Sequence, residues 1–404
     1  MEHIVESSAV LKDVRYEIRG QLANHALELE KRGYEIISLN IGNPGLFGFR
    51  TPETMRLAMI ENLAQAEPYC HQKGIFPARE AVVMQQQNRG VHGVTADEVF
   101  IGNGVSELID LSLRALLNPG DEVLVPSPDY PLWSAAVALN GGVAKHYACP
   151  RETGFKPDIE DMERLISPRT RAIVVINPNN PSGAVYDRET LEAIASLAER
   201  HALVVLSDEI YDQMVYDEAE FVPMATLVHE TVCLTYSGLS KIYRACGYRV
   251  GWCVFSGDLE MASDYIHGME LLAALRLCSN VPAQWAVQTA LGGFQSIVDL
   301  VSPGGRLYQS RQALIDRVAA SKYLDLQKPM GAMYAFIRLD PRFDGKLDDQ
   351  AFAYELLEKQ HVLVAPGSSF NTPYKDHFRV TTLPDPETID LVFDRIETCL
   401  AQHA

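Results

Sequence analysis

The sequence predicts an α/β fold in which helices cover both faces of a mostly parallel sheet, together with a smaller α+β domain. Between residues 98 and 255, short apolar runs rich in β-branched residues alternate with amphipathic stretches, which is the pattern of parallel α/β units. These runs are nearly continuous in apolar residues, as is typical of strands buried on both faces. The chain has 404 residues, more than one hydrophobic core usually serves, so we expect two domains of unequal size.

The large sheet is expected to contain six of these runs, at 98–101, 122–126, 172–176, 203–207, 232–236 and 250–255. Between them lie stretches with the apolar period of an amphipathic helix, such as 106–117 and 188–201. A polar residue that follows a strand of such a sheet is a candidate for ligand binding, because α/β sheets bind ligands beyond the carboxyl ends of their strands.

After residue 305 the pattern changes. A helical stretch at 307–321, strand-like runs at 333–338 and 362–366, and a final helix at 387–404 indicate a separate α+β unit. A helix at 14–32 is expected to join this unit across the chain. We therefore expect an N-terminal segment over 1–45, a large domain over 46–305 and a small domain over 306–404.

Composition excludes several classes of protein. The net charge of −18 argues against a nucleic-acid surface, which normally carries a basic patch. No apolar run approaches the roughly 20 residues of a membrane span, and the first 20 residues lack the apolar core of a secretory signal. The seven cysteines are scattered, without CxxC or Cys/His metal spacing, so we expect reduced thiols, no metal site and a cytoplasmic location.

Lys241 is the first candidate for chemistry. It follows the expected strand 232–236 and lies among small residues in Ser237-Gly-Leu-Ser-Lys241, where an aldehyde could reach its amine. Desolvation or a neighbouring cation could lower its pKa enough for nucleophilic attack. Arg249, eight residues further on, offers such a cation and could bind a phosphate in a forked geometry. Alone, a loop lysine is usually a solvated charge.

The segment Asp208-Glu-Ile-Tyr211 strengthens this interpretation. It follows the expected strand 203–207, where a carboxylate could pair with a protonated pyridine nitrogen and Tyr211 could bind the phenolic oxygen of the same ring. Seen alone, Asp208 could equally be a helix N-cap beside a packed tyrosine.

Three further segments follow other strands. The turn at 177–183 contains Asn180, which could also bind the phenolic oxygen, and Tyr130 could stack on an aromatic ring. In Gly102-Asn-Gly104, glycine would let a phosphate approach the helix that follows, where Val105 and Ser106 offer N–H groups. Each has a structural reading as an ordinary turn, but five such segments at the strand ends of one sheet indicate a binding site.

In this combination the chain resembles the fold-type I aminotransferases of class I and II, from about residue 14 to the C-terminus. The landmarks that match in order are Gly42, Tyr69, Asn180, Asp208, Tyr211, Lys241, Arg249 and Arg379. Within the family the chain is most similar to the bacterial glutamate–pyruvate (alanine) aminotransferases. The similar stretches are 39–44, 102–108, 176–181, 238–241 and 378–384.

The resemblance implies a homodimer that uses pyridoxal 5'-phosphate and works by a ping-pong mechanism. It implies that Lys241 forms the Schiff base and moves the substrate Cα proton, and that Asp208 pairs with the pyridinium. The other implied cofactor contacts are Asn180 and Tyr211 on the phenolic oxygen, Tyr130 on the ring, and Val105, Ser106 and Arg249 on the phosphate, with Tyr69 of the neighbouring subunit. For the substrate α-carboxylate it implies Arg379, with Gly42 and Asn180, because a guanidinium binds a carboxylate in two places.

One departure concerns the phosphate. Gly238 stands where many relatives carry a serine, and Ser237 or Ser240 could replace that contact. Ser182 replaces the commoner threonine of the NPxG turn, which we expect to be harmless.

Alternatives remain for the reaction. Valine–pyruvate, aspartate or aromatic aminotransferases would use the same cofactor residues, and Arg19 or Arg276 could bind a distal carboxylate. A β-lyase is also compatible with them, whereas a regulator built on this fold would carry an added basic helix-turn-helix region. Among these reactions the resemblance favours transamination between alanine and 2-oxoglutarate, with Arg19 as first and Arg276 as second candidate for the distal carboxylate.

Overall fold

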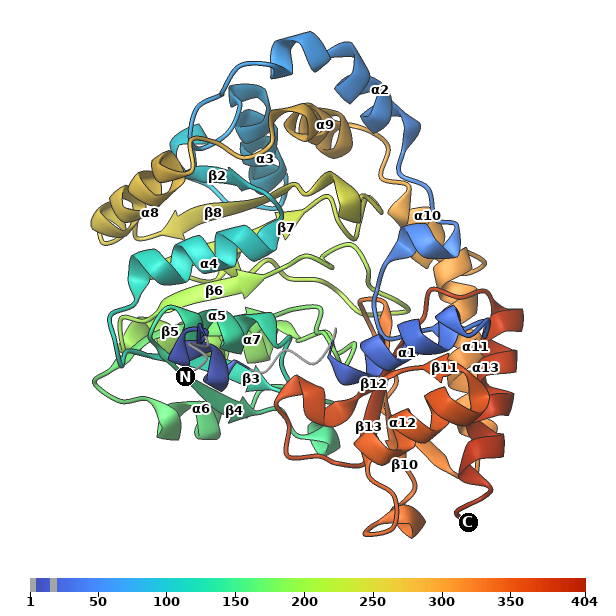
Figure 1. The fold of residues 1–404 in the computed structure, drawn as a ribbon. Helices are drawn as coiled ribbons and strands as arrows, with labels where there is room; N and C mark the ends of the chain where they lie inside the picture. The colour runs from blue at the N-terminus through green and yellow to red at the C-terminus, as the bar shows by residue number, and fades with distance from the viewer. Residues whose placement is uncertain (1–4, 15–19) are drawn as a thin grey trace.

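Seven strands form the large sheet of the computed structural model, which describes residues 5–14 and 20–404 (Figure 1). Their order is β2-β8-β7-β6-β5-β3-β4, and β8 alone runs antiparallel to its neighbours. The mostly parallel sheet is thereby confirmed. The bounds are β2 (Val99–Gly102), β3 (Glu122–Ser127), β4 (Val143–Ala148), β5 (Thr170–Ile176), β6 (Val204–Asp208), β7 (Val232–Gly238) and β8 (Gly251–Gly257).

Helices cover both faces of this sheet, because the strands carry apolar residues on both sides. Along β5, Ile173 and Val175 belong to one buried cluster and Val174 and Ile176 to another. The first cluster includes residues of α3 (Phe76–Asn88), α6 (Ile159–Leu165), α7 (Arg188–Arg200) and α9 (Val281–Gly292), and the second those of α4 (Val105–Leu116), α5 (Leu132–Leu139) and α8 (Ser263–Leu275). The short helices α2 (Glu53–Glu61) and α10 (Ile297–Val301) add Met55, Ile297 and Val301 to the first cluster (Figure 1).

A smaller α+β body has its own antiparallel sheet, in the order β12-β13-β10-β9, and a two-stranded parallel sheet β1-β11. A separate buried cluster that includes Leu314, Phe352 and Ile396 forms its core. Its strands are β1 (Ile37–Ser38), β9 (Leu324–Leu326), β10 (Tyr334–Leu339), β11 (Val362–Leu363), β12 (Ala365–Pro366) and β13 (His377–Thr381), and its helices are α1 (Gln21–Lys31), α11 (Arg306–Ala320), α12 (Asp349–Gln360) and α13 (Pro386–Leu400).

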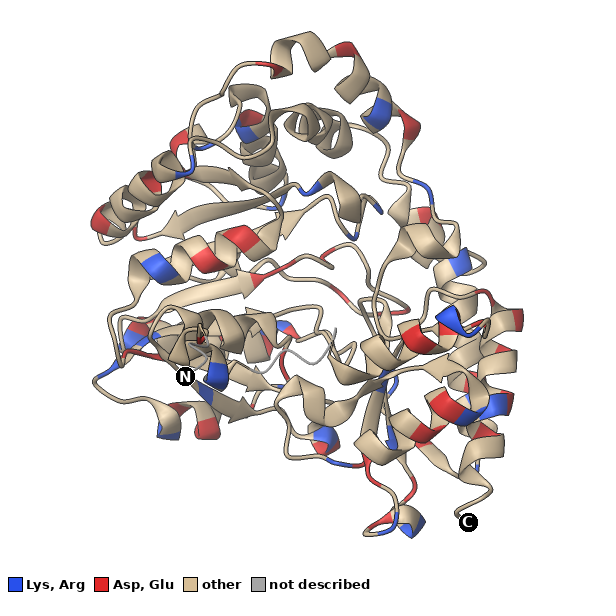
Figure 2. Cartoon of the chain, viewed as in Figure 1, with Lys and Arg blue, Asp and Glu red and all other residues tan. Residues whose placement is uncertain are grey.

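The N-terminal helix belongs to this body: Ala26 and Leu29 of α1 pack in one cluster with Leu357 of α12 and Leu363 of β11. We propose the division at residues 45/46 and 305/306, which the separate core of the small body supports. Figure 2 shows acidic and basic residues interspersed along the helices of this body, and Arg317 pairs with Asp394 at 2.5 Å. Among the described residues, none of the helices has the length and apolar character to cross a membrane.

The structure corrects three expectations. The helix expected from residue 14 begins at Gln21, since Val14 is extended and Gly20 caps α1; residues 15–19 lie outside the described residues. The last helix ends at Leu400 rather than 404. Strand β4 was not predicted, because this outer strand leaves most of its side chains partly exposed and so lacks an apolar run.

The parallel strands of the large sheet end at one common edge, and the small body lies against it. Arg379 of β13 donates to Asn180, which follows β5, at 2.8 Å, and the Asp129 N–H, just after β3, donates to the carbonyl of Phe370 at 2.9 Å. Residues that follow different strands of the large sheet are therefore brought together with residues of the small sheet.

Candidate active site

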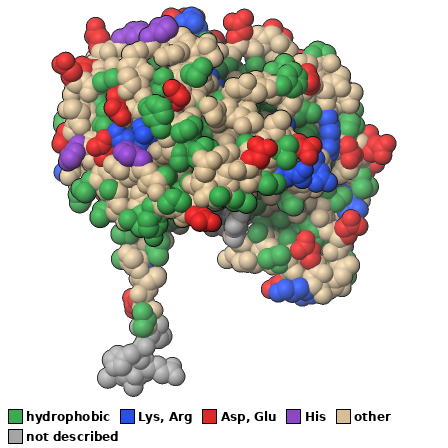
Figure 3. Space-filling view, turned by 90° about the horizontal axis from the view of Figure 1, so that it is seen from above, with side chains coloured by type: hydrophobic (Ala, Val, Ile, Leu, Met, Phe, Trp, Pro, Cys, Tyr) green, Lys and Arg blue, Asp and Glu red, His purple; other side chains and the backbone are tan. Residues whose placement is uncertain are grey.

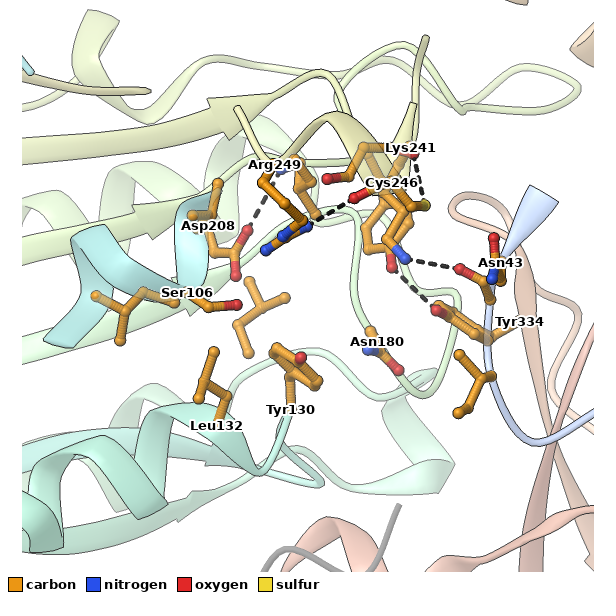
Figure 4. Close-up of a pocket in the computed structure, with 18 of the residues that line it drawn as sticks. Asn43, Ser106, Tyr130, Leu132, Asn180, Asp208, Lys241, Cys246, Arg249 and Tyr334 are labelled. Atoms are coloured by element: carbon orange, nitrogen blue, oxygen red, sulfur yellow. Dashed lines mark hydrogen bonds between the residues drawn. The ribbon is translucent and has the colours of Figure 1, made fainter. Parts of the chain in front are cut away.

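A cavity of about 720 Å³ opens at this edge between the two bodies (Figure 4). Ten of the predicted site residues line it: Gly42, Val105, Ser106, Tyr130, Asn180, Asp208, Tyr211, Lys241, Arg249 and Arg379. The segments that carry them follow β1, β2, β3, β5, β6 and β7 or belong to β13. Convergence of strand ends therefore builds the cavity.

Three predicted residues are not among those that line it. Tyr69 lies on the surface and is 77% exposed. Arg276 directs its guanidinium at Glu107 and at the carbonyl of Ile101. Arg19 lies outside the described residues.

Lys241 lies in the turn that follows β7, which ends at Gly238. Its ammonium donates at 2.7 Å to the carbonyl of Gly42, which lies in the segment after β1 (Figure 4). The side chain is half-buried, so the amine can reach a ligand in the cavity. This is the position that a nucleophile or a proton carrier requires.

Asp208 is the last residue of β6 and is 4% exposed. The indole N–H of Trp133 donates to its Oδ2 at 3.0 Å. Burial raises the pKa of the Asp208 carboxyl to about 6, although the Trp133 hydrogen bond, the Ile210 N–H and the Lys241 ammonium all favour the ionised form. A buried carboxylate of this kind is stabilised by a cationic partner from the cavity.

Trp133 was not predicted as a site residue. It lies on α5, is fully buried and packs edge-on against Tyr236 with a centroid distance of 5.3 Å, so in the sequence it resembles an ordinary core residue. The one available indication was that a buried indole N–H usually has a hydrogen-bond acceptor.

A second end of the cavity is shaped to receive an anion. The chain enters α4 through Gly104, whose φ of +84° favours glycine, and a Cβ there would collide with the guanidinium of Arg249. A Cβ on Gly251 would similarly crowd the backbone N–H of Val105. Val105 and Ser106 at the start of α4, together with Arg249, therefore line one end of the cavity, where backbone N–H groups of a helix N-terminus, a hydroxyl and a guanidinium can bind an anion.

Of the two serines considered as substitutes near Gly238, Ser240 lines the cavity. Ser237 lies within β7 and is buried. Of these two serines, Ser240 alone can therefore replace the phosphate contact that is missing at Gly238.

Arg379 is 2% exposed and spans the two bodies. It donates to Asn180 Oδ1 at 2.8 Å and to the carbonyl of Asn40, and its guanidinium carbon lies 4.3 Å from the ring centre of Tyr334. Because the guanidinium is fixed on both sides, it presents its charge to the cavity in one orientation.

Tyr334, on β10, is a lining residue that sequence reasoning missed. The Tyr211 hydroxyl donates to the Tyr334 hydroxyl at 3.1 Å. Burial acts to raise the pKa of Tyr334, but Lys241, Arg379 and the Tyr211 hydrogen bond outweigh it, so its pKa is lowered. Burial raises the pKa of Tyr211 well above its ordinary value. Tyr211 is therefore held as a neutral donor beside a polarised Tyr334 hydroxyl.

The charged lining residues among those described are three cations, Lys241, Arg249 and Arg379, and one carboxylate, Asp208. The cavity thus suits a ligand with more than one anionic group, together with a cationic group that faces Asp208. A phosphate at the α4 end and a carboxylate at Arg379 meet the first requirement.

Comparison with known proteins gives consistent matches. The family model for aminotransferase class I and II matches residues 34–396. The chain is 46% identical over 399 residues to glutamate-pyruvate aminotransferase AlaA of Escherichia coli K12, which covers 99% of this chain and 98% of the relative. It is 47% identical over 397 residues to alanine aminotransferase of Mycobacterium tuberculosis H37Rv, which covers 98% and 92%.

Solved structures agree with these relatives. An aminotransferase from Escherichia coli is similar with a TM-score of 0.97 and 45% identity, over 99% of both chains. Alanine aminotransferase from Pyrococcus furiosus is similar with a TM-score of 0.93 and 35% identity, over 98% of this chain and 100% of that one.

Proposed function

The chain belongs to the class I and II aminotransferases, which are pyridoxal-phosphate enzymes, and from this premise we propose that it transfers an amino group between alanine and 2-oxoglutarate in a ping-pong cycle. The relatives named for glutamate–pyruvate or alanine transamination, at 46–47% identity over nearly the whole chain, support this choice of substrates. The observation that carries the proposal is the cavity itself, in which Lys241 and Asp208 face one space with Arg249 at one end and Arg379 at the other.

The residues fit the cofactor. Burial raises the pKa of Asp208 to about 6 although Lys241 favours its ionised form, so a protonated pyridine nitrogen would give this carboxylate a further cationic partner. We propose that Val105, Ser106 and Arg249 hold the phosphate, that Asn180 and Tyr211 hold the phenolic oxygen, and that Tyr130 lies on the ring. When bound, pyridoxal phosphate supplies an electron-withdrawing ring that stabilises negative charge at the substrate Cα.

The chain's own residues then have separate tasks. Lys241 would hold the cofactor through Nζ, and its free amine would carry the proton to and from the substrate Cα. Arg379 grips the α-carboxylate, with Asn180 and Gly42 beside it, and so fixes the Cα–H bond relative to Lys241. We propose Arg19 for the distal carboxylate of glutamate.

The specificity is tested by single-turnover half-reactions followed by absorbance, with alanine, glutamate, valine and aspartate as amino donors. Alanine and glutamate are expected to react faster than valine and aspartate. If valine outruns both, the protein is a valine–pyruvate aminotransferase. If the products include a cleaved side chain, the β-lyase reading takes its place.

We also propose a homodimer in which Tyr69 completes the phosphate site of the partner subunit. Tyr69 is 77% exposed and does not line the cavity of its own chain. Nearby surface elements expose large apolar side chains, and Figure 3 shows hydrophobic groups spread over this face. Those on α2, on the short 3-10 helix after it (Leu63–Ala66), on α3 and in the α8–α9 link are 44–74% exposed: Leu57, Ile60, Leu63, Phe76, Leu275 and Leu277. Burial of such a surface against a second copy would stabilise the dimer.

Complementation tests the shared site. Tyr69→Ala and Lys241→Ala chains, each inactive alone, are expected to regain activity when they are mixed and allowed to exchange subunits. Full activity of a monomer at high dilution would contradict the proposal.

We propose a cytoplasmic, reducing location for the protein. All seven cysteines are free thiols, which is compatible with such a compartment.

A further inference from the structure

A cluster of polar side chains lies behind the turn that leads from β2 into α4, on the side away from the cavity. The Glu107 carboxylate accepts the backbone N–H of Asn103 at 2.7 Å and its side-chain N–H at 3.0 Å. The same carboxylate lies 3.3 Å from Arg276 Nε. Arg276 also donates to the carbonyl of Ile101 at 3.0 Å, so one guanidinium holds both the strand end and the carboxylate that holds the turn.

Asn103 connects this cluster to Arg249. Its side-chain oxygen accepts both the backbone N–H of Asn280, at 2.9 Å, and the side-chain N–H of Asn280, at 3.2 Å. Asn280 in turn donates to the carbonyl of Arg249 at 2.9 Å, and the Arg249 guanidinium lies 3.4 Å from the carbonyl of Asn103. The turn and Arg249 are therefore fixed relative to each other by Asn103 and Asn280.

The charge of Glu107 creates a difficulty that Arg276 resolves. Glu107 lies in the first turn of α4, next to Ser106, where a phosphate would meet the helix N-terminus. A carboxylate so close would repel a phosphate, and its side chain is only 23% exposed, which weakens screening by solvent. The Arg276 side chain is 16% exposed and does not line the cavity, so its charge is directed to Glu107.

We propose that Arg276 is a positioning residue for the phosphate of the cofactor: it neutralises Glu107 and keeps that carboxylate on Asn103, so that the 102–104 turn and Arg249 are held open for the anion. This inference rests on the proposed function, because it takes the α4 end of the cavity as the phosphate site. It assigns Arg276 to the cofactor instead of the distal carboxylate of the substrate.

The test compares two ligands that differ only in the phosphate. Dissociation constants of pyridoxal phosphate and of pyridoxal are measured by absorbance for the full chain stripped of cofactor, and their ratio gives the preference for the phosphate. Arg276→Gln is expected to lower this preference about tenfold, as for the loss of one charge-assisted interaction, because it leaves Glu107 unpaired. The affinity for pyridoxal is expected to stay within about twofold, which also shows that the pocket is folded.

The decisive variant is the double one. Adding Glu107→Gln to Arg276→Gln removes the unpaired charge but keeps an acceptor for the Asn103 N–H, so it is expected to recover most of the lost preference. The matched control adds Glu189→Gln instead, an exposed glutamate in the first turn of α7, and is expected to recover none. A residue that acted only through stability would give a double variant worse than either single change.

The outcomes separate the two proposals. If the unmutated chain binds pyridoxal as tightly as pyridoxal phosphate, the proposed phosphate site is wrong. If it prefers the phosphate and Arg276→Gln keeps the full preference, the positioning role is wrong. A loss confined to glutamate as substrate, with cofactor binding unchanged, would assign Arg276 to the distal carboxylate.

Discussion

Removal of the indole N–H of Trp133 is predicted to move the pH dependence of cofactor binding. This N–H donates to Asp208 Oδ2 at 3.0 Å in a buried setting and lowers the pKa of a carboxyl that burial has raised to about 6. A hydrogen bond to a charged group stabilises it by about 1.5 kcal/mol or more. If the ionised form alone loses that much stabilisation, the pKa of Asp208 rises by about one unit.

The sign follows from which form of Asp208 the hydrogen bond favours. Trp133→Phe destabilises the carboxylate and leaves the carboxylic acid unchanged, so the pKa rises further above its ordinary value. Binding that requires the carboxylate is then lost at a higher pH on the acid side. In Trp133→Phe the aromatic packing against Tyr236 is kept, which limits the change to the hydrogen bond.

The assay is the affinity of the cofactor-free full chain for pyridoxal phosphate between pH 5 and 8. For the unmutated chain the acid limb is expected near pH 6, and for Trp133→Phe about one unit higher. Tyr236→Phe is the control: it removes a buried hydroxyl that donates to Ser112, not to Asp208. An unmoved limb in Trp133→Phe, or an equal movement in Tyr236→Phe, would refute the reasoning.

Three other substitutions test the site and a buried carboxylate next to Asp208 in the chain. Lys241→Ala is expected to slow transamination at least about 100-fold. Treatment with borohydride should attach the cofactor covalently to the unmutated chain but not to this variant, as measured by mass spectrometry. Gly42→Ala is expected to lower kcat/KM about tenfold or more, because a Cβ would collide with the Tyr334 hydroxyl; Gly292→Ala, which meets nothing within 4 Å, is the control. Burial raises the pKa of Glu209 to about 7, so its protonated form contributes stability that is lost as pH rises from about 4.5 to 7. Glu209→Gln is therefore expected to reduce the fall of Tm with pH over that range. An unchanged dependence of Tm on pH would contradict this.

The strands and their common edge could be predicted from the sequence because each has a local cause. An apolar run such as that of β6 can be buried only between two layers of helices. Asp208 ends β6 and Lys241 follows the end of β7, so both residues reach the same edge of the sheet. Strand β4 could not be predicted in this way, since an outer strand with Lys145 and His146 has no such run.

Tyr334 and Trp133 could not be identified because their roles depend on packing between distant segments. Tyr334 lies in β10 beside Thr381 of β13, among residues that the sequence presents only as the buried face of a strand. Its contact with Tyr211 joins positions 123 residues apart, and the Trp133–Asp208 contact joins positions 75 apart. No spacing rule within one element could connect these pairs.

Arg276 shows why a charge found in the sequence does not identify its partner. The sequence made Arg276 a candidate for binding a substrate carboxylate, and it does pair with a carboxylate: Glu107, in its own chain. A half-buried arginine and a half-buried glutamate are each stabilised by a counter-charge, so they form an ion pair with each other unless a ligand binds one of them more strongly. The distal carboxylate of a five-carbon substrate would have to displace Glu107 and leave it unpaired beside the proposed phosphate site. An arginine without a competing carboxylate would bind glutamate with less loss.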